Sequence, residues 1–378
     1  MRSLDLFTGI GGFSHALRGL ATPVAYCEID TKACAILRAR MADGSLPTAP
    51  ICHDVTQLDA SWLSENGCAG GGAVVDLLTA GFPCQGFSPQ GCLAGYEHAG
   101  SGLFNHIARL AGELAPPLIL LENVPEIVRL GMDRIVDYLG KKHRYELRWC
   151  VLGALHLGAP HARRRWFCLA VDNANPRTAS LLAQVAADEP PPLHQWTSMH
   201  DRPRMTLSNL PENRVRCAAL GNAVVPDCVR LAFQRLSALP AVRPWRSARR
   251  AWPPCGRWQP PGGELGAWRL DLCRGQKRDY GLVFDPSLYH EPGTVPSAKV
   301  TSPLVTTPQR AARFSTPRHC MVHAVRFLTE RGLRDLPNQL RFEAGTSNEE
   351  RPGQMLATFV EWLMGYPPGW TEVPAQGT

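Results

Sequence analysis

Short apolar runs, each closed by a glycine or a polar residue, recur through the first half of the chain. They cover residues 3–7, 24–29, 73–80, 117–121, 145–152 and 166–171. Runs of this length are typical of strands buried within a sheet, and the segments 13–18 and 103–110 between them favour helices. This alternation of strands and helices indicates an α/β fold.

The third of these runs leads directly into the sequence GFPCQG at residues 81–86. A buried strand brings the next loop to the carboxyl edge of the sheet, where open α/β folds bind their ligands. Pro83 fixes its own φ and restricts Phe82, so the chain before Cys84 is stiff, while Gly86 leaves room for a close approach. A lone cysteine is more often a small buried hydrophobe than a nucleophile, so the role of Cys84 depends on its neighbours.

A glycine turn, TGIGG at residues 8–12, follows the first run. Glycines let the backbone pass close to a ligand, although a plain tight turn would use them equally well. The second run ends in Glu28-Ile29-Asp30, and an acid at the end of the second strand is where such folds hold a ribose. A helix N-cap explains Asp30 as well, but not Glu28. Asp54 is either a turn residue or an acceptor for an exocyclic amine.

Two further sets of polar residues are expected at the same edge of the sheet. The run at 117–121 ends at Glu122, and a carboxyl that emerges from an apolar strand is costly to leave charged. A raised pKa and a proton-donor role are natural there, while capping of the next helix is the alternative. Arg163 and Arg165 share one face of an extended stretch and suit phosphate or carbonyl oxygens, unless they form a solvated basic turn.

The second half of the chain changes in composition twice. Proline, aspartate, serine and asparagine dominate residues 172–212, which predicts a long connection with little packed structure. After Pro240 arginine, tryptophan, proline and glycine dominate, a mixture that can grip phosphates and stack on bases but also forms ordinary surface. We therefore expect a first unit over 1–240 and a smaller recognition unit over 241–378, which ends in a short amphipathic helix.

Composition narrows the class of protein. The chain has 378 residues, a hydrophobic content of 44% that supports a real core, and a net charge of +7 that permits a polyanionic partner. Its 13 cysteines include no C-x-x-C pair, so we expect no metal cluster and a reducing compartment. No signal peptide and no apolar run long enough for a membrane span are found, which predicts a soluble intracellular protein.

Taken together, these segments resemble the cytosine-C5 methyltransferases, and the first six of them follow the order and spacing of that family. The resemblance lies in DLFTGIGGF at residues 5–13, EID at 28–30, HDV at 53–55, GFPCQGFS at 81–88, LENV at 121–124, GAPHARRR at 158–165 and LGNAVVP at 220–226. It implies a doubly wound, mostly parallel sheet with helices on both faces, as in Rossmann-like methyltransferases, beside a smaller irregular recognition domain.

The resemblance also implies a reaction, namely transfer of a methyl group from S-adenosyl-L-methionine to C5 of cytosine in double-stranded DNA. Cys84 would be the covalent nucleophile at C6, Glu122 would protonate N3, and Arg165 with Arg163 would hold the ring oxygen and the adduct. The target base must be flipped out of the duplex. For the cofactor it assigns, in chain order, Phe7, Gly9, Gly11, Glu28, Ile29, Asp54 and Asn222. A monomer is the default expectation.

The chain departs from the usual pattern of this family in the order of its last motifs. LGNAVVP at 220–226 comes before the expected recognition region, and WLMGYP at 362–367 comes last, as in some phage and large-virus relatives. His161 also replaces the usual glutamine. Two other functions are considered: the tRNA-directed branch, whose Cys-Phe-Thr signature is not found, and an idle DNA-binding protein, which would not need Cys84, Glu122, Arg163 and Arg165 together.

Overall fold

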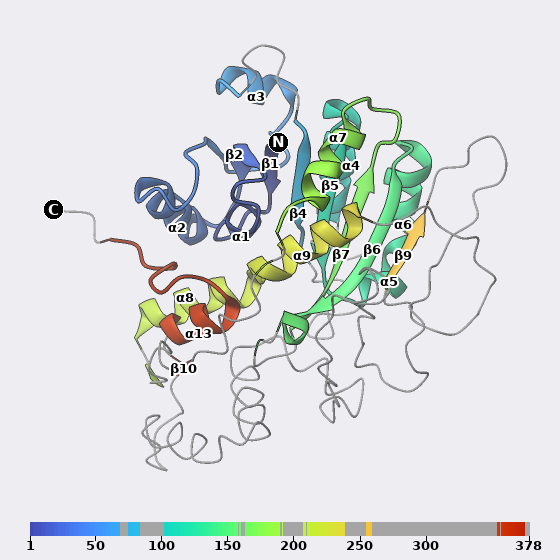
Figure 1. The fold of residues 1–378 in the computed structure, drawn as a ribbon. Coiled ribbons are helices and arrows are strands. Elements are labelled where there is room, and N and C mark those ends of the chain that lie inside the picture. Colours follow the sequence, from blue (N-terminus) through green and yellow to red (C-terminus); the bar gives the residue numbers. More distant parts are fainter. Residues whose placement is uncertain are drawn as a thin grey trace.

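The computed structural model places one large sheet at the centre of the residues that it describes (Figure 1). These are residues 1–68, 75–83, 102–157, 159, 163–189, 191, 207–208, 210–238, 255–258, 354–355 and 357–374. The sheet has eight strands in the order β3-β2-β1-β4-β5-β7-β6-β9. They are β1 (Arg2–Leu6), β2 (Thr22–Cys27), β3 (Ile51–Cys52), β4 (Leu77–Gly81), β5 (Leu118–Asn123), β6 (Glu146–Gly153), β7 (Arg164–Val171) and β9 (Cys255–Trp258).

The direction of the strands confirms the predicted doubly wound, mostly parallel sheet. Strands β3, β2, β1, β4 and β5 pair in parallel, whereas β7 runs antiparallel to both β5 and β6, and β9 runs antiparallel to β6. The chain moves outward from β1 to β3 and then returns to the other side of β1 with β4. The strand order therefore reverses between β1 and β4, which is where folds of this type bind their ligands.

Helices cover both faces of the sheet, because each strand offers side chains to both. In β5, Leu118 and Leu120 belong to the core shared with α1, α7 and α9, while Ile119 and Leu121 belong to the core shared with α4 and α6. The helices are α1 (Gly12–Ala16), α2 (Thr31–Ala42), α3 (Ala60–Glu65), α4 (Phe104–Leu114), α5 (Ile127–Leu130), α6 (Met132–Ile135), α7 (Thr178–Ala186), α8 (Pro211–Asn222), α9 (Pro226–Ser237) and α13 (Ala357–Met364). A π-helical segment (Val136–Lys142) and a 3-10 turn (Ala154–Leu157) complete the helical structure described. None of the described helices is long and apolar enough to cross a membrane.

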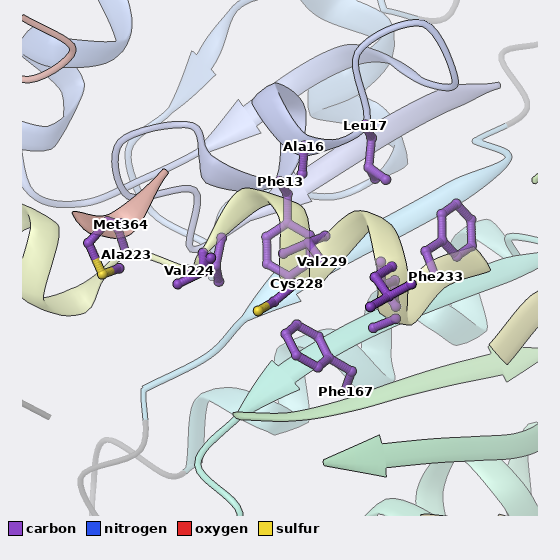
Figure 2. Close-up of a cluster of buried hydrophobic side chains, with 14 of the residues drawn as sticks. Phe13, Ala16, Leu17, Phe167, Ala223, Val224, Cys228, Val229, Phe233 and Met364 are labelled. Atoms are coloured by element: carbon purple, nitrogen blue, oxygen red, sulfur yellow. The ribbon is translucent and has the colours of Figure 1, made fainter. Parts of the chain in front are cut away.

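Helix α9 lies between α1 and the sheet and supplies much of this core (Figure 2). Its side chains Cys228, Val229 and Phe233 are buried against Phe13 of α1 and Phe167 of β7. Arg230 of the same helix donates hydrogen bonds to the carbonyls that end α1 and forms an ion pair with Asp188. Helix α9 therefore holds the end of α1, the helix that follows the glycine turn, although Arg230 and Ala16 are 214 positions apart in the chain.

Two expectations about local structure have clear outcomes. The Asp30 carboxylate accepts hydrogen bonds from the backbone N–H groups of Lys32 and Ala33, so its alternative role as the N-cap of α2 is confirmed. Little packed structure was expected over 172–212, and this was wrong for Thr178–Ala186, which form α7. Leu181 and Val185 of α7 are buried in the core, a helical spacing concealed by the polar residues on either side.

The C-terminal segment packs beside helix α8, although more than a hundred residues separate the two in sequence (Figure 1). Met364, Tyr366 and Trp370 are buried in the same core as Phe13. The short strands β8 (Leu207–Ser208) and β10 (Gln354–Met355) pair antiparallel just before the two helices begin. The division at residue 240 stays a prediction, but the described end of the chain shares its core with the first unit.

His15 makes the stability of this packing depend on pH. Its ring packs against that of Trp370 with 4.4 Å between centroids, and burial, with a smaller effect of Arg18, lowers its pKa to about 4. Between that value and 6.5 an unfolded histidine binds a proton that the folded one refuses, so stability decreases as the pH falls through this range.

We expect His15→Phe to remove this part of the pH dependence, because phenylalanine keeps the ring contact and cannot be protonated. When the pH is lowered from neutral to about 4, the free energy of unfolding measured in urea should fall by on the order of 2 kcal/mol more in the wild type than in the variant. Equal losses in the two proteins would show that His15 is not responsible.

Candidate active site

Three loops leave the sheet at one edge, because β1, β4 and β5 are parallel neighbours. Leu6 at the end of β1 pairs with Ala80, and Gly81 at the end of β4 pairs with Glu122 of β5. Strand β7 runs the other way, so its first residues, Arg164 and Arg165, reach this same edge. The sequence prediction that Glu122 and the start of the Cys84 loop meet here agrees with the register. Cys84 itself lies outside the described residues.

Glu122 is a buried carboxyl with a cationic partner. Its side chain is 10% exposed, and Oε1 lies 3.0 Å from Nε of Arg165. Burial raises the pKa of Glu122, while the charges of Arg165 and, more weakly, Arg163 oppose that increase. The predicted direction of the pKa shift and its cause, the cost of a charge at the end of an apolar strand, are both found in the structure.

Arg163 and Arg165 use their guanidinium groups differently, although both act electrostatically on Glu122. Arg165 forms the ion pair with that carboxyl. Arg163 is 4% exposed, and its Nη2 donates to the carbonyls of Gly221 at 2.8 Å and Ala223 at 2.5 Å. The structure therefore gives Arg163 a second connection, to the end of α8, that the alternation along the extended stretch did not predict.

Asn123 is a residue of this edge that the sequence reasoning missed. Its Nδ2 donates to the carbonyl of Phe82 at 3.1 Å, and its Oδ1 accepts from the backbone N–H of Val124 at 2.8 Å. The amide thus ties the end of β5 to the chain two residues before Cys84. The available signal was a second polar residue, directly after Glu122, at the end of the apolar run of β5. Pro83 and Asn123 together restrict the chain that leads to the thiol.

The glycine turn after β1 has the backbone conformation that its residues predict. Gly9 and Gly11 have φ of 57° and 83°, and Phe7 shares this left-handed region at 52°. A Cβ at Gly9 would meet nothing within 4 Å, so the backbone is open to a close approach there. A Cβ at Gly11 would lie 2.5 Å from Cδ1 of Leu46, so packing against Leu46 also requires glycine at this position.

Glu28 connects this turn to the end of β2. Its Oε2 accepts from the backbone N–H of Gly9 at 2.6 Å, and its Oε1 accepts from the N–H of Asp30 at 2.8 Å. A carboxylate accepts about four hydrogen bonds, so roughly half of this capacity is left for another partner. The neighbouring Ile29 is 76% exposed, an unusual position for a large apolar side chain.

The Asp54 carboxyl lies after β3, in a turn that α4 holds in place. Its Oδ1 accepts from the backbone N–H of Thr56 at 2.8 Å, and the hydrogen bonds from Thr56 lower its pKa. Arg109 of α4, a second residue missed from the sequence, donates to the carbonyls of Val55 at 3.0 Å and Leu58 at 2.7 Å. Asp54 therefore remains charged at neutral pH on a turn that is fixed from its far side.

Asn222 is the last residue of α8 and is exposed. The carbonyls on either side of it, those of Gly221 and Ala223, are the ones that Arg163 binds. The backbone on both sides of Asn222 is therefore bound to the guanidinium group of Arg163. Over the part of the chain described, no group of three or more histidine, cysteine or acidic residues is arranged to hold a metal ion.

Comparison with protein families gives one match, and it covers this whole site. The model of the C-5 cytosine-specific DNA methylase family matches residues 1–230, which contain all the residues discussed above. That is more than half of the 378 residues.

Individual relatives differ in how much of the chain they match. Type II methyltransferase M.CviJI of Paramecium bursaria Chlorella virus IL3A is 28% identical over 97% of this chain and 96% of its own length. Type II methyltransferase M.HhaI of Haemophilus parahaemolyticus is 30% identical over 46% of this chain and 50% of its own. Among solved structures, a putative DNA modification methyltransferase from an E. coli prophage is 28% identical with a TM-score of 0.38, covering 46% of this chain and 47% of that one. The chain thus spans nearly the whole viral relative but about half of the bacterial ones.

The Glu122–Arg165 pair predicts how the carboxyl titrates. Arg165→Met should raise the pKa of Glu122 further, because the positive charge that favours the carboxylate is lost while burial remains. Carbon-13 NMR of protein labelled at glutamate carboxyl carbons measures this, with Glu122→Gln identifying the signal. Titration of Glu122 at an unchanged or lower pH in the variant would contradict the assigned cause.

Proposed function

The chain belongs to the C-5 cytosine-specific DNA methylase family and is a DNA cytosine-5-methyltransferase, and from this premise we propose how it acts. It transfers the methyl group of S-adenosyl-L-methionine to C5 of a cytosine in double-stranded DNA, through a covalent adduct between Cys84 and C6. The observation that carries the proposal is the buried Glu122 carboxyl, paired with Arg165 one strand away from the end of β4.

Cys84 is the nucleophile in this proposal. Its thiolate adds to C6, so an S–C6 bond forms and the electron pair of the C5–C6 double bond moves to C5. Glu122 donates a proton to N3 and neutralises the charge that would otherwise build up on the ring. The adduct makes C5 nucleophilic. Once C5 carries a methyl group, the C5 proton passes to water. The C5–C6 double bond reforms as the S–C6 bond breaks and the Cys84 thiolate leaves, and the proton on N3 returns to Glu122.

Arg165 has a double function in this scheme. Its Nε holds the Glu122 carboxyl, and a guanidinium has further donors in a fixed plane that can bind the O2 carbonyl of the base. Arg163 supports the same site by fixing the carbonyls of Gly221 and Ala223. In a site that excludes water, donors already fixed in place stabilise developing charge without reorganising during the reaction.

The residues around the glycine turn fit S-adenosyl-L-methionine. The open backbone at Gly9, beside Phe7 and Gly11, accepts the methionine end. The unused acceptor capacity of Glu28 suits the two ribose hydroxyls, and exposed Ile29 offers an apolar surface to a ring. Charged Asp54 accepts from an exocyclic amine, and Asn222 contributes from the end of α8. Bound there, the cofactor supplies an electrophilic methyl group.

The target atoms C5 and C6 are not accessible to a cysteine within a stacked duplex, so the cytosine must be flipped into the site. The net charge of +7 suits a polyanionic partner. We assign recognition of the DNA sequence to residues 241–378, rich in arginine and tryptophan before the C-terminal helix. The family match ends at residue 230, so this region lies outside the part of the chain that the family model covers.

Covalent capture tests the nucleophile. Duplex DNA with 5-fluorocytosine at the target should trap the protein with cofactor as a stable adduct, because fluorine cannot leave C5 as a proton does. Cys84→Ala should abolish trapping, as seen on denaturing gels, and methylation, as seen by bisulfite sequencing, while S-adenosylmethionine still binds. Methylation of DNA by Cys84→Ala would refute the mechanism.

Glu122→Gln tests the proton donor. Glutamine keeps the size of the side chain but cannot protonate N3, so we expect methyl transfer to fall by about 10²-fold or more. Single-turnover methylation of a target duplex measures the rate, and binding of the same duplex provides the control, since its affinity should change much less. A variant with near-normal turnover would remove Glu122 from the reaction.

A further inference from the structure

The glycine turn that receives the cofactor in our proposal is fixed at successive backbone positions. Thr8 donates from its backbone N–H to the carbonyl of Cys27 at 3.0 Å, and the N–H of Gly9 donates to Glu28. The carbonyl of Ile10 accepts from Nε1 of Trp370 at 2.9 Å. The first two contacts come from the last residue of the neighbouring strand β2 and from the residue that follows it. The third comes from a residue 360 positions later in the chain.

Trp370 is itself held firmly in place. Its side chain is 2% exposed, and its ring packs on His15 and Tyr366 at 4.4 and 5.4 Å between centroids. The Tyr366 hydroxyl donates to the carbonyl of Val224 at 3.0 Å, at the turn after α8. Arg40 of α2 donates to the carbonyl of Gly369 at 2.5 Å. The indole therefore reaches Ile10 from a site fixed by α1, α2 and the turn between α8 and α9.

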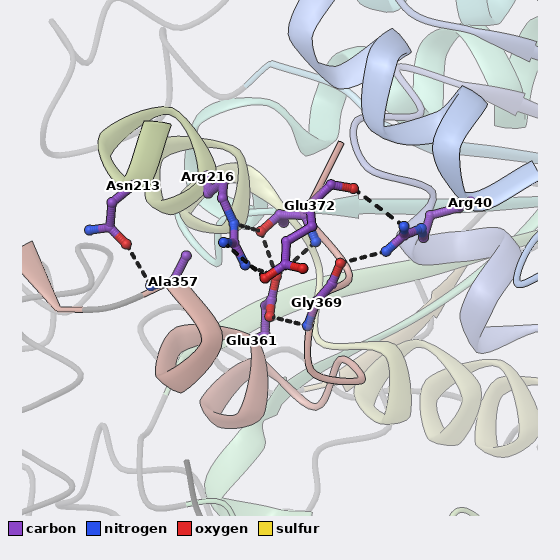
Figure 3. A network of polar contacts seen from close by, with 8 residues as sticks. Arg40, Asn213, Arg216, Ala357, Glu361, Gly369 and Glu372 are labelled. Carbon is purple, nitrogen blue, oxygen red and sulfur yellow. Dashed lines mark hydrogen bonds and ion pairs between the residues drawn. The ribbon is translucent and has the colours of Figure 1, made fainter. Parts of the chain in front are cut away.

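A buried carboxylate, that of Glu361, shapes the turn that carries Trp370 (Figure 3). Its Oε2 accepts from the N–H of Gly369 at 2.7 Å, and its Oε1 accepts from the N–H and the hydroxyl of Thr371. Arg216 of α8 neutralises it, with Nη2 at 3.1 Å from Oε1. The backbone N–H groups on both sides of Trp370 thus bind one carboxylate, which sets the direction of the indole.

Helices α8 and α13 are also joined at their beginnings. Oδ1 of Asn213 accepts from the backbone N–H of Ala357 at 2.7 Å, so α8 binds the first residue of α13 (Figure 3). The other end of α8 is bound by Arg163 through the carbonyls of Gly221 and Ala223. A continuous set of contacts therefore leads from the active-site arginines through α8 and Glu361 to Trp370 and the glycine turn.

We propose that Trp370 is a positioning residue for cofactor binding: its indole N–H fixes the peptide of Ile10, and thereby the backbone of Gly9 and Gly11. The inference rests on the proposed use of this turn for S-adenosyl-L-methionine. A turn with three glycines among five residues has many conformations to lose, so an anchor that removes them before binding increases affinity. In this chain the anchor comes from the last motif, near the C-terminal end of the proposed recognition region.

The test removes the N–H group of Trp370. Replacement of Trp370 by the isosteric 3-benzothienylalanine removes that group and keeps the two-ring shape. Trp370→Phe removes the N–H group together with one of the two rings and keeps an aromatic contact. Calorimetry with S-adenosylmethionine, well below the unfolding transition, should show affinity reduced by about 5- to 10-fold, as one lost hydrogen bond predicts. The KM for the cofactor should rise equally, while kcat at saturating cofactor stays within about 2-fold of the wild-type value. The matched control is Trp362→Phe, which should leave the affinity for the cofactor unchanged. Trp362 is a partly buried tryptophan of α13 whose ring packs against Phe359.

Failure of the inference and failure of the proposed function give different results. A wild-type protein that does not bind S-adenosylmethionine would refute the proposed cofactor. If the wild type binds it and both replacements of Trp370 bind it equally well, the inference is wrong, and a lower melting temperature in those variants would then reflect packing alone. An equal loss of affinity in Trp362→Phe would also overturn the assignment to the N–H group.

Glu361 allows a second test of the same proposal, because its carboxylate binds the backbone N–H groups on both sides of Trp370. Glu361→Gln replaces one acceptor oxygen by an NH₂ group, so the N–H groups of Gly369 and Thr371 cannot both keep their partners. We expect cofactor affinity to fall in the same direction as for Trp370→Phe. Glu372→Gln is the control, since Glu372 also pairs with Arg216, at 3.2 Å, but is 57% exposed. Equal affinities for Glu361→Gln and Glu372→Gln would contradict the proposed route.

Discussion

Strand β4 is the constraint on which the site depends. It pairs in parallel with β1 on one side and with β5 on the other, so the residues that follow all three strands emerge together. The glycine turn, the chain that leads to Cys84 and the Glu122 carboxyl are therefore neighbours through backbone hydrogen bonds alone. Side chains then adjust this arrangement, as when Asn123 binds the carbonyl of Phe82. Mutations of those side chains should alter the site more than the fold.

The arrangement of α8 and α13 explains how the unusual motif order is compatible with this fold. Helix α8 follows the sheet in sequence and α13 ends the chain, yet Arg216, Glu361 and Asn213 join them closely. The strands β8 and β10, which precede the two helices, pair with each other. The two helices therefore begin beside each other. They can make the same contacts whichever of them comes first in the sequence. M.CviJI, whose alignment covers 97% of this chain, is a relative in which these contacts can be examined.

The sequence predicted those features that local chemistry determines. Apolar runs located the strands β1, β2, β4, β5, β6 and β7, but not the short strands β3 and β9 of the same sheet. The glycine pattern located the turn at Gly9 and Gly11, and the apolar run before Glu122 predicted a raised pKa. It did not predict the contacts of Arg163 or Trp370, because their partners are carbonyls of residues 58 and 360 positions away. Every residue has a carbonyl, so such a partner leaves no pattern in the sequence. Helix α7 was missed for a different reason, since its few buried positions lie within a polar stretch.

The state of Glu122 follows from two opposing effects of similar size. Removing a carboxylate from water costs several kcal/mol in a protein interior, which favours the protonated form. A guanidinium at 3.0 Å favours the carboxylate, by roughly 5 kcal/mol if the effective dielectric constant is near 20. Burial is the larger of the two, so the pKa is raised, but Arg165 keeps the proton from being held tightly. Burial therefore favours the protonated form, which can donate, while Arg165 favours release of the proton. An acid that must protonate a ring nitrogen and later recover its proton requires both.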